Sequence, residues 1–230
     1  MIPERKYSAI IVAGGKGYRV GGELPKQFIS IGGKPMLMHT IQAFYDYDYR
    51  VRIIVVLPDG YKPLWQQLCD EYRFAINHTI VYGGETRFHS VKNGLSLISD
   101  EETVCIHDAA RPFVTSGLIG RCFDIAFNDN CGVIPVIDEV NSVRRLTEKG
   151  SEIANREELK IVQTPQAFPA EQLKAAYNTH YLPVFTDDAS VAEISGIKII
   201  LTEGEESNIK VTTAFDIELA EFYLKYLSKR

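Results

Sequence analysis

The stretch AIIVAGGKGYRVGGELPKQF, residues 9–28, combines glycines and cations in a way that suits phosphate binding. An apolar run leads into five glycines, and Lys16, Arg19 and Lys26 are accompanied by only one acid, Glu23. Glycines let a ligand approach backbone N–H groups closely, and fixed cations offset the charge that develops on phosphoryl oxygens. The stretch is therefore a candidate triphosphate-binding loop, although a surface loop with solvated cations would have the same composition.

Two common phosphate-binding motifs do not match this loop. The dinucleotide fingerprint G-x-G-x-x-G fits Gly15 and Gly17 but meets Val20 at its third glycine position. A P-loop counted from Gly17 reaches Gly22 and then Glu23, where the motif requires lysine. Hydride transfer on a dinucleotide-binding domain is therefore disfavoured, and a different kind of nucleotide site is indicated.

Asp108 and Lys210 are two further residues whose chemistry suits a phosphate site. Asp108 follows the apolar run Val104–Ile106, so we expect it at the carboxyl end of a strand. Magnesium binds through few protein carboxylates together with substrate phosphates and water, which one aspartate can satisfy. A turn or cap is the alternative role for Asp108, and a surface position is the alternative for Lys210.

The elements that would position these residues are predicted by apolar runs. Alternation of such runs with amphipathic stretches indicates an α/β fold with a mostly parallel, Rossmann-like twisted sheet flanked by helices. No linker or repeat divides the sequence, so we predict one domain over residues 1–230. The expected strands are YSAIIV, VRIIVVL, TVCIH, CGVIPVI and GIKIILT, and the expected helices are 34–46, 61–72, one from Thr86 onward, and 214–227.

The segment 138–163 departs from this rhythm. Its alternating NSVRRLT, the turn-like EKGSE and the short run LKIVQ predict a β-hairpin with polar flanks. A hairpin of this size inserted in an α/β domain is either a surface loop or an arm that reaches another subunit. The sequence pattern alone does not separate these two interpretations.

Composition narrows the class of partner. Lys+Arg 25 against Asp+Glu 30 gives a formal net charge of −5, and no basic run of the kind that binds nucleic acid occurs. The opening MIPERKYSAIIVAGG has too short an apolar stretch for a signal peptide or a membrane span, so a cytoplasmic protein is expected. Four cysteines without a C-x-x-C pair are expected as reduced, buried thiols.

The motifs together resemble one enzyme family. IIVAGGKGYRVGGELPKQF is similar to the nucleotide-binding loop of the sugar-nucleotidyltransferase superfamily, in the version A-G-G-x-G-x-R…P-K-Q used by cytidylyltransferases for alditol-type phosphates. GGETRFHSV, HDAARPFV, QTPQAF, FTDDAS and NIKVTT follow in the family's order. The best resemblance is to the 2-C-methyl-D-erythritol 4-phosphate cytidylyltransferases, which implies CMP transfer from CTP, with Mg²⁺, in the non-mevalonate route to isoprenoids.

The resemblance implies roles for residues in each motif. Lys26, Arg19 and Lys210 would neutralise the triphosphate during catalysis, and Asp108 would hold the metal. The cytosine would be read by the loop 83–90. The full set of nucleotide-binding residues implied in this way is Ala13, Gly14, Gly15, Gly84, Glu85, Ser90 and Ala109.

The resemblance also implies a site for the second substrate. The second substrate is a phosphate monoester, and its attacking oxygen is already anionic near neutral pH. No general base is therefore required, and His107 is interpreted as a buried side chain. In the family the arm crosses to a partner chain, which implies a homodimer whose Ser142 and Arg156 serve the other subunit's site. The segment IDEVNSVRR is longer than the family pattern at this point, which makes Ser142 the weakest match, with Asp138 or Asn141 as alternatives. The implied substrate residues are Arg111, Ser142, Arg156, Thr164, Thr186 and Asp187.

Three alternatives share part of this pattern. A ribitol-5-phosphate cytidylyltransferase would have the same glycine loop, but its usual D-A-V-R-P differs from DAARP here. Uridylyl- or thymidylyltransferases for sugar 1-phosphates commonly carry G-x-G-T-R-L and P-K-P, whereas this chain has Gln27 after Lys26. A non-catalytic nucleotide sensor or scaffold would be favoured by loss of the catalytic residues, all of which are present.

Overall fold

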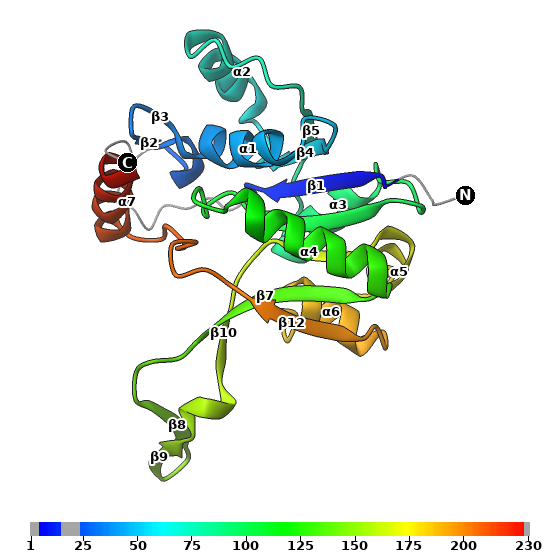
Figure 1. Ribbon diagram of the computed structural model, residues 1–230, viewed down its shortest axis with the longest axis vertical. Helices are drawn as coiled ribbons and strands as arrows, with labels where there is room; N and C mark the ends of the chain where they lie inside the picture. The colour runs from blue at the N-terminus through cyan, green and yellow to red at the C-terminus, as the bar shows by residue number, and fades with distance from the viewer. Residues whose placement is uncertain (1–4, 15–23, 228–230) are drawn as a thin grey trace.

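A computed structural model describes residues 5–14 and 24–227 of this 230-residue chain. Its centre is an eight-stranded sheet in which β1 (Tyr7–Val12) lies between β4 (Arg52–Leu57) and β6 (Thr103–Asp108) (Figure 1). The remaining strands of this sheet are β5 (Thr79–Tyr82), β7 (Gly132–Asp138), β10 (Lys160–Val162), β11 (Gln166–Pro169) and β12 (Ile199–Glu203).

The pairing of the strands confirms the mostly parallel sheet. β5, β4, β1 and β6 form a parallel block, and β7 pairs in parallel with β12. The exception is the antiparallel β11, which pairs with both β6 and β7. β10 precedes β11 along the same side of β7, with Val162 opposite Val136 and Ala167 opposite Val133. β5 and β11 are not among the predicted strands, because each is a run of only four residues.

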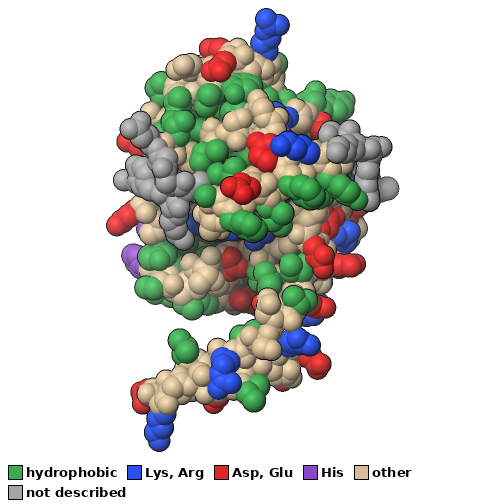
Figure 2. Space-filling view, turned by 90° about the vertical axis from the view of Figure 1, so that its left-hand side faces the viewer, with side chains coloured by type: hydrophobic (Ala, Val, Ile, Leu, Met, Phe, Trp, Pro, Cys, Tyr) green, Lys and Arg blue, Asp and Glu red, His purple; other side chains and the backbone are tan. Residues whose placement is uncertain are grey.

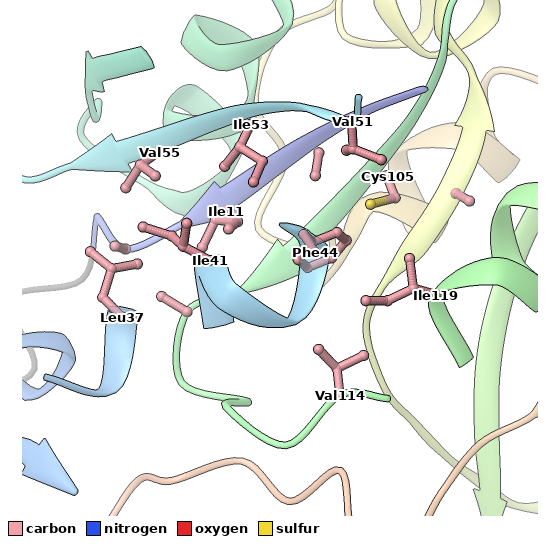
Figure 3. Close-up of a cluster of buried hydrophobic side chains, with 14 of the residues drawn as sticks. Ile11, Leu37, Ile41, Phe44, Val51, Ile53, Val55, Cys105, Val114 and Ile119 are labelled. Carbon is pink, nitrogen blue, oxygen red and sulfur yellow. The ribbon is translucent and has the colours of Figure 1, made fainter. Parts of the chain in front are cut away.

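Helices cover both faces of the sheet, because successive strand residues point to opposite sides. Ile11, Ile53 and Val55 point to one face and Ile10 and Ile54 to the other. Figure 3 shows the first of these clusters, in which Phe44 and Ile119 meet the strands. The helices on this face are α1 (Met36–Tyr47), α2 (Lys62–Glu71) and α4 (Ser116–Asp129); on the other are α3 (Arg87–Leu95), α5 (Ala170–Ala176) and α6 (Asp188–Ile194).

The last helix, α7 (Ala214–Leu227), packs at the left edge of the molecule in Figure 1. It covers a third apolar cluster together with the short hairpin of β2 (Ser30–Ile31) and β3 (Lys34–Pro35). The helix is capped at its start, since the backbone N–H of Asp216 donates to Thr213 Oγ1 at 3.2 Å. The predicted buried, unbonded cysteines are also confirmed: Cys69, Cys105, Cys122 and Cys131 are free and buried.

The predicted hairpin exists, but one of its strands was wrongly placed. β8 (Val143–Thr147) pairs with β9 (Gly150–Ala154), and this hairpin projects from the body as an arm (Figure 1). The run LKIVQ was expected to be the returning strand, yet Lys160–Val162 instead forms β10 on β7 of the main sheet. The periodicity fits both positions, and only pairing with β7 decides between them. A 3-10 helix at Arg156–Glu158 connects β9 to β10.

Candidate active site

A pocket of about 610 Å³ lies where β1 and β6 end. Ligands of open α/β sheets bind at this carboxyl edge, where the backbone N–H groups of the following loops point outward. The lining comes from both ends of the chain and its middle: Val12, Ala13, Gly14, Lys26, Gln27, Gly84, Glu85, Thr86, Arg87, Ser90, Asp108, Ala109, Ala110 and Lys210. These residues come from stretches that are far apart in the sequence, so the fold is what brings them together.

Asp108 is the last residue of β6 and a buried carboxylate in this pocket. Its Oδ2 lies 2.6 Å from Lys210 Nζ, and its Oδ1 lies 3.4 Å from Arg87 Nε. Burial alone would raise the pKa of Asp108, but the charges of Arg87 and Lys210 outweigh burial and hold that pKa well below its ordinary value. Asp108 is therefore ionised at neutral pH.

Lys26 enters the pocket from the PKQF turn. After Pro25 the chain makes a 3-10 helix over Lys26–Phe28, in which Gln27 is buried and donates to the Ala13 carbonyl at 2.7 Å. The Lys26 ammonium donates to the Val211 carbonyl at 3.1 Å. Ala13 at the end of β1, the PKQF turn and the NIK segment thus meet at one place. Gly15, Lys16 and Arg19 lie outside the described residues.

Lys210 is held beside Asp108 by the segment that follows it. The backbone N–H of Val211 donates to the Ala110 carbonyl at 2.8 Å, just beyond the end of β6. Val211 itself is fully buried in the α7 cluster. The two cations Lys26 and Lys210 therefore approach the same carboxylate-bearing edge from opposite ends of the chain, which suits a polyanionic ligand.

The loop before α3 forms another wall of the pocket. Thr86 caps α3, and Ser90 Oγ donates to the Thr86 carbonyl at 3.0 Å while accepting the Gly84 N–H at 3.1 Å. A Cβ on Gly84 would lie 2.4 Å from His89 Cβ, so only glycine fits this turn. Ser90, 2% exposed, holds the turn in shape in addition to lining the pocket.

His107 is buried beneath the site, as predicted. Its Nε2 lies 3.1 Å from the Arg111 carbonyl, which can only accept, so Nε2 carries the proton. Its Nδ1 then accepts from Thr164 Oγ1 at 3.0 Å, and Thr164 Oγ1 in turn accepts the Asp108 backbone N–H at 3.1 Å. Burial lowers the pKa of His107 to about 4, so the ring is neutral and positions Thr164.

Arg111, a predicted substrate residue, lies in a structural position outside the pocket lining. It is 8% exposed, and its guanidinium donates to the carbonyls of Asn208 at 2.7 Å and Val162 at 3.4 Å. Asn208 in turn donates to the Thr164 carbonyl at 2.8 Å. Arg111 therefore ties β10 and the segment before Lys210 to the end of β6. Burial lowers its pKa, and its Nε has no hydrogen-bond partner within the described residues.

Thr186 and Asp187 precede α6, near the pocket wall but not part of its lining. Asp187 caps α6 by accepting the Ser190 N–H at 2.9 Å, and it accepts from Gln166 Nε2 at 2.8 Å. Ser142 and Arg156 flank the β8–β9 hairpin, which projects from the body (Figure 1), and neither lines the pocket. Arg156 donates to the Val140 carbonyl at 2.7 Å. Within one chain these four residues are not brought to Asp108.

Sequence reasoning missed the pair Arg87 and Asp188. The Arg87 guanidinium donates to both oxygens of the fully buried Asp188 at 2.9 and 2.8 Å, and Tyr177 donates its hydroxyl to the same carboxylate at 2.6 Å. Burial would lower the pKa of Arg87, but Asp188 and then Asp108 raise it instead. Both residues lie inside motifs used in the sequence analysis, GGETRFHSV and FTDDAS. The arginine of the first motif and the aspartates of the second have opposite charges, and that could have indicated an ion pair between the two motifs.

The fold and site define the chain as a nucleotidyltransferase of the Rossmann-like type. A family model described as IspD, 2-C-methyl-D-erythritol 4-phosphate cytidylyltransferase, matches residues 7–226. The chain therefore belongs to this family, as its motifs predicted, and is a cytidylyltransferase.

Relatives and solved structures agree with this assignment. A relative from Bacteroides thetaiotaomicron of the same description is 52% identical over 95% of this chain and 100% of its own length. One from Bacteroides fragilis is 54% identical over 94% of this chain and 99% of its own. The crystal structure of 4-diphosphocytidyl-2C-methyl-D-erythritol synthase from Anaerococcus prevotii superposes with a TM-score of 0.81 at 28% identity, covering 96% of each chain.

Proposed function

We propose that this chain transfers CMP from CTP to 2-C-methyl-D-erythritol 4-phosphate, forming 4-diphosphocytidyl-2-C-methyl-D-erythritol and pyrophosphate. Family membership supports the reaction. The observation that carries the proposal is that Lys26, Asp108 and Lys210, from three distant parts of the chain, line one pocket at the strand ends.

The reaction needs charge neutralisation more than acid–base catalysis. A phosphate oxygen of the acceptor attacks the α-phosphorus of CTP, the bond from that phosphorus to the bridging oxygen breaks, and pyrophosphate leaves with the electron pair. No proton has to move, because the attacking oxygen is already anionic near neutral pH. The reaction therefore asks for no general base, and the buried His107 serves to position Thr164.

Lys26 and Lys210 meet the triphosphate in this proposal, together with Arg19 from the glycine loop. Positioned cations act most strongly where negative charge develops in the transition state. The cytosine lies against the loop 83–90, with the backbone around Gly84 and Glu85 and the wall formed by Ser90. A base site on so tight a turn is expected to fit a pyrimidine and to crowd a larger purine.

Asp108 is the residue that would hold Mg²⁺. The described residues contain no group of three metal-ligating side chains, but an ionised carboxylate facing a phosphate site suits a metal that takes most of its ligands from phosphates and water. When bound, the metal would neutralise phosphate oxygens and help pyrophosphate to leave. Asp108 Oδ2, which contacts Lys210 here, would be an oxygen able to hold the metal, and the Lys210 ammonium would then be available to the phosphates.

The second substrate's site is assigned to two chains in this proposal. Thr164, Thr186 and Asp187 would come from the same chain as the pocket, and Ser142 and Arg156 would come from the arm of a partner subunit in a homodimer. The exposed arm and the absence of these two residues from the described pocket support that arrangement. Within residues 5–14 and 24–227 no helix has the length and apolarity to cross a membrane.

We also propose that the enzyme works in the cytoplasm, and that it has no nucleic-acid partner.

Pyrophosphate release tests the reaction and its acceptor. CTP and Mg²⁺ are supplied with 2-C-methyl-D-erythritol 4-phosphate, with ribitol 5-phosphate, or with no acceptor. We expect release with the first acceptor at a rate far above the other two reactions. Faster release with ribitol 5-phosphate would overturn the acceptor, and no release with either would overturn the proposed function.

A further inference from the structure

Helix α7 has two apolar sides. One side packs against the body of the protein, where Ala220 is fully buried and Ile217 and Leu224 contact the third core cluster. The other side is exposed and carries large hydrophobic residues that line neither the pocket nor a core cluster. These residues, the α7 stripe, are Phe215 at 72% exposure, Leu219 at 41%, Phe222 at 67% and Tyr226 at 45%.

The α7 stripe has the spacing of a helix-pairing seam. Its members follow one another at intervals of four, three and four residues, which is the a/d pattern of a heptad repeat. With about 100° of rotation per residue they fall within an arc of roughly 60°. Figure 2, which looks onto this side of the molecule, shows hydrophobic side chains interspersed with acidic ones. Such a stripe on a surface helix is suited to a second helix rather than to solvent.

We propose that the α7 stripe packs against the α7 stripe of a second copy of this chain, with the two helices antiparallel. A twofold axis between Ala220 and Glu221 sets Leu219 opposite the partner's Phe222. The same axis sets Phe215 opposite the partner's Tyr226. All four members of the stripe then have an apolar partner in one symmetric contact, as a closed twofold interface requires.

The flanking charges select this orientation. Glu218 and Lys225 lie seven residues apart on the same flank of the stripe, at the g positions of the heptad. In the antiparallel pair, Glu218 faces the partner's Lys225, and symmetry repeats the contact. In a parallel pair Glu218 would instead face the partner's Tyr223, so the charge complementarity would be lost. Charges at these positions determine partner and orientation in paired helices.

The contact is independent of the proposed catalytic function. Two 14-residue helices offer less surface than the roughly 1,200 Å² of a standard stable interface, so the pairing is expected to be weak by itself. If the arm also joins two chains, the α7 contact adds a second, weaker association step. Loss of that step would leave the pocket residues in place.

Sedimentation velocity over a concentration series measures this step in the full-length protein. Phe222→Glu is expected to weaken the association by about tenfold or more, since it introduces a charge opposite the partner's Leu219. Leu201→Glu is the matched control: Leu201 is also an exposed apolar residue, at 55%, but lies on β12. Unchanged association in Phe222→Glu, or equal weakening in both variants, would overturn the proposal.

Charge exchange tests the orientation. Glu218→Lys and Lys225→Glu are each expected to weaken association, because each variant faces like charges across the twofold axis. Mixing the two variants restores both opposite-charge pairs, so the mixture is expected to associate about as tightly as the unaltered protein. Residues 218 and 225 are about 10 Å apart along one helix, so their side chains are too far apart to form an opposite-charge pair within one chain. Failure of the mixture to recover would overturn the antiparallel pairing.

Discussion

At the scale of single residues, the site depends on charges that are fixed before a ligand binds. Asp108 touches Lys210 and Arg87, and Arg87 is itself held by the buried Asp188. Each of these residues has its orientation set by a partner from a distant segment. The chemistry of a triphosphate site is thus prepared by interactions that also stabilise the fold.

Lys26→Ala is expected to lower turnover by about a hundredfold while leaving the thermal midpoint almost unchanged. The ammonium meets charge that develops in the transition state, whereas the turn around it is anchored by the buried Gln27. Lys62→Ala, at the exposed start of α2, is the control. Steady-state pyrophosphate release and calorimetry provide the two readouts, and we expect Arg19→Ala to behave like Lys26→Ala. Normal turnover in both loop variants would contradict the phosphate-binding role.

Asp188→Asn is expected to lower the free energy of unfolding by about 2 kcal/mol. Asparagine keeps the shape of the side chain but leaves the Arg87 guanidinium without its buried counter-ion. Because Arg87 is 28% exposed and can turn toward water, the loss should fall below that of a fully buried pair. Urea unfolding of Asp188→Asn, Arg87→Met and the double variant measures the coupling. Strictly additive losses would show that the pair contributes nothing as a pair.

At the scale of elements, α2 shows how a helix end and a loop are fixed together. Trp65 of α2 donates its Nε1–H to His78 Nε2 at 2.8 Å, and His78 Nδ1 donates to the Ile76 carbonyl at 2.7 Å. The carbonyl can only accept, so Nδ1 carries a proton, and the indole N–H can only donate, so Nε2 carries none and His78 is neutral. The end of α2 is closed by Arg73 in a left-handed conformation with φ of 50°.

Acidification is expected to weaken this anchor. Burial lowers the pKa of His78 below its ordinary value near 6.5, so the unfolded chain binds a proton more readily than the folded one. Stability is therefore fully present above the unfolded pKa and falls as the pH drops through that value, by about 1 kcal/mol for the lost Trp65 hydrogen bond. Urea unfolding at pH 7.5 and 5.5 should show a smaller decrease in His78→Gln than in the unaltered protein, with the exposed His180→Gln as control.

Arg73→Gly is expected to stabilise the protein by about 1 kcal/mol, because the left-handed conformation strains any residue with a Cβ. Arg73 is exposed and follows the end of α2, where its backbone N–H donates to the Asp70 carbonyl at 3.2 Å. Asn130 ends α4 with φ of 49° and is the natural comparison, since asparagine tolerates this conformation better. Thermal unfolding of both glycine variants should show the larger gain at position 73.

At the scale of the whole molecule, the parallel framework and the pocket's main residues could be predicted from the sequence. The long β-branched runs mark β1, β4 and β6, and residues directly after them necessarily lie at one edge of the sheet. The path of the arm could not be predicted, because LKIVQ fits the arm hairpin and the main sheet equally well by pattern. The Arg87–Asp188 contact likewise depends on the first residues of α3 and α6 meeting in space, which no local spacing specifies.

A shared active site would make activity depend on two chains at once. In the proposed homodimer, Lys26 acts in its own subunit's pocket while Arg156 reaches the partner's pocket from the arm. Lys26→Ala and Arg156→Ala should therefore each be nearly inactive alone. In a hybrid dimer, one pocket combines an intact Lys26 with an intact Arg156 from the opposite chain.

Mixing the two inactive variants under conditions that allow subunit exchange is expected to restore activity, to about a quarter of that of the unaltered enzyme at equal amounts. Half of the dimers are then hybrids, and one of the two pockets in each hybrid is complete. Lys26→Ala mixed with Lys210→Ala is the matched control, because both changes fall in the same pocket and every hybrid pocket remains defective. Recovery of activity in this control would contradict the shared site. So would a lack of recovery when Lys26→Ala is mixed with Arg156→Ala, which would indicate that each pocket is built from one chain.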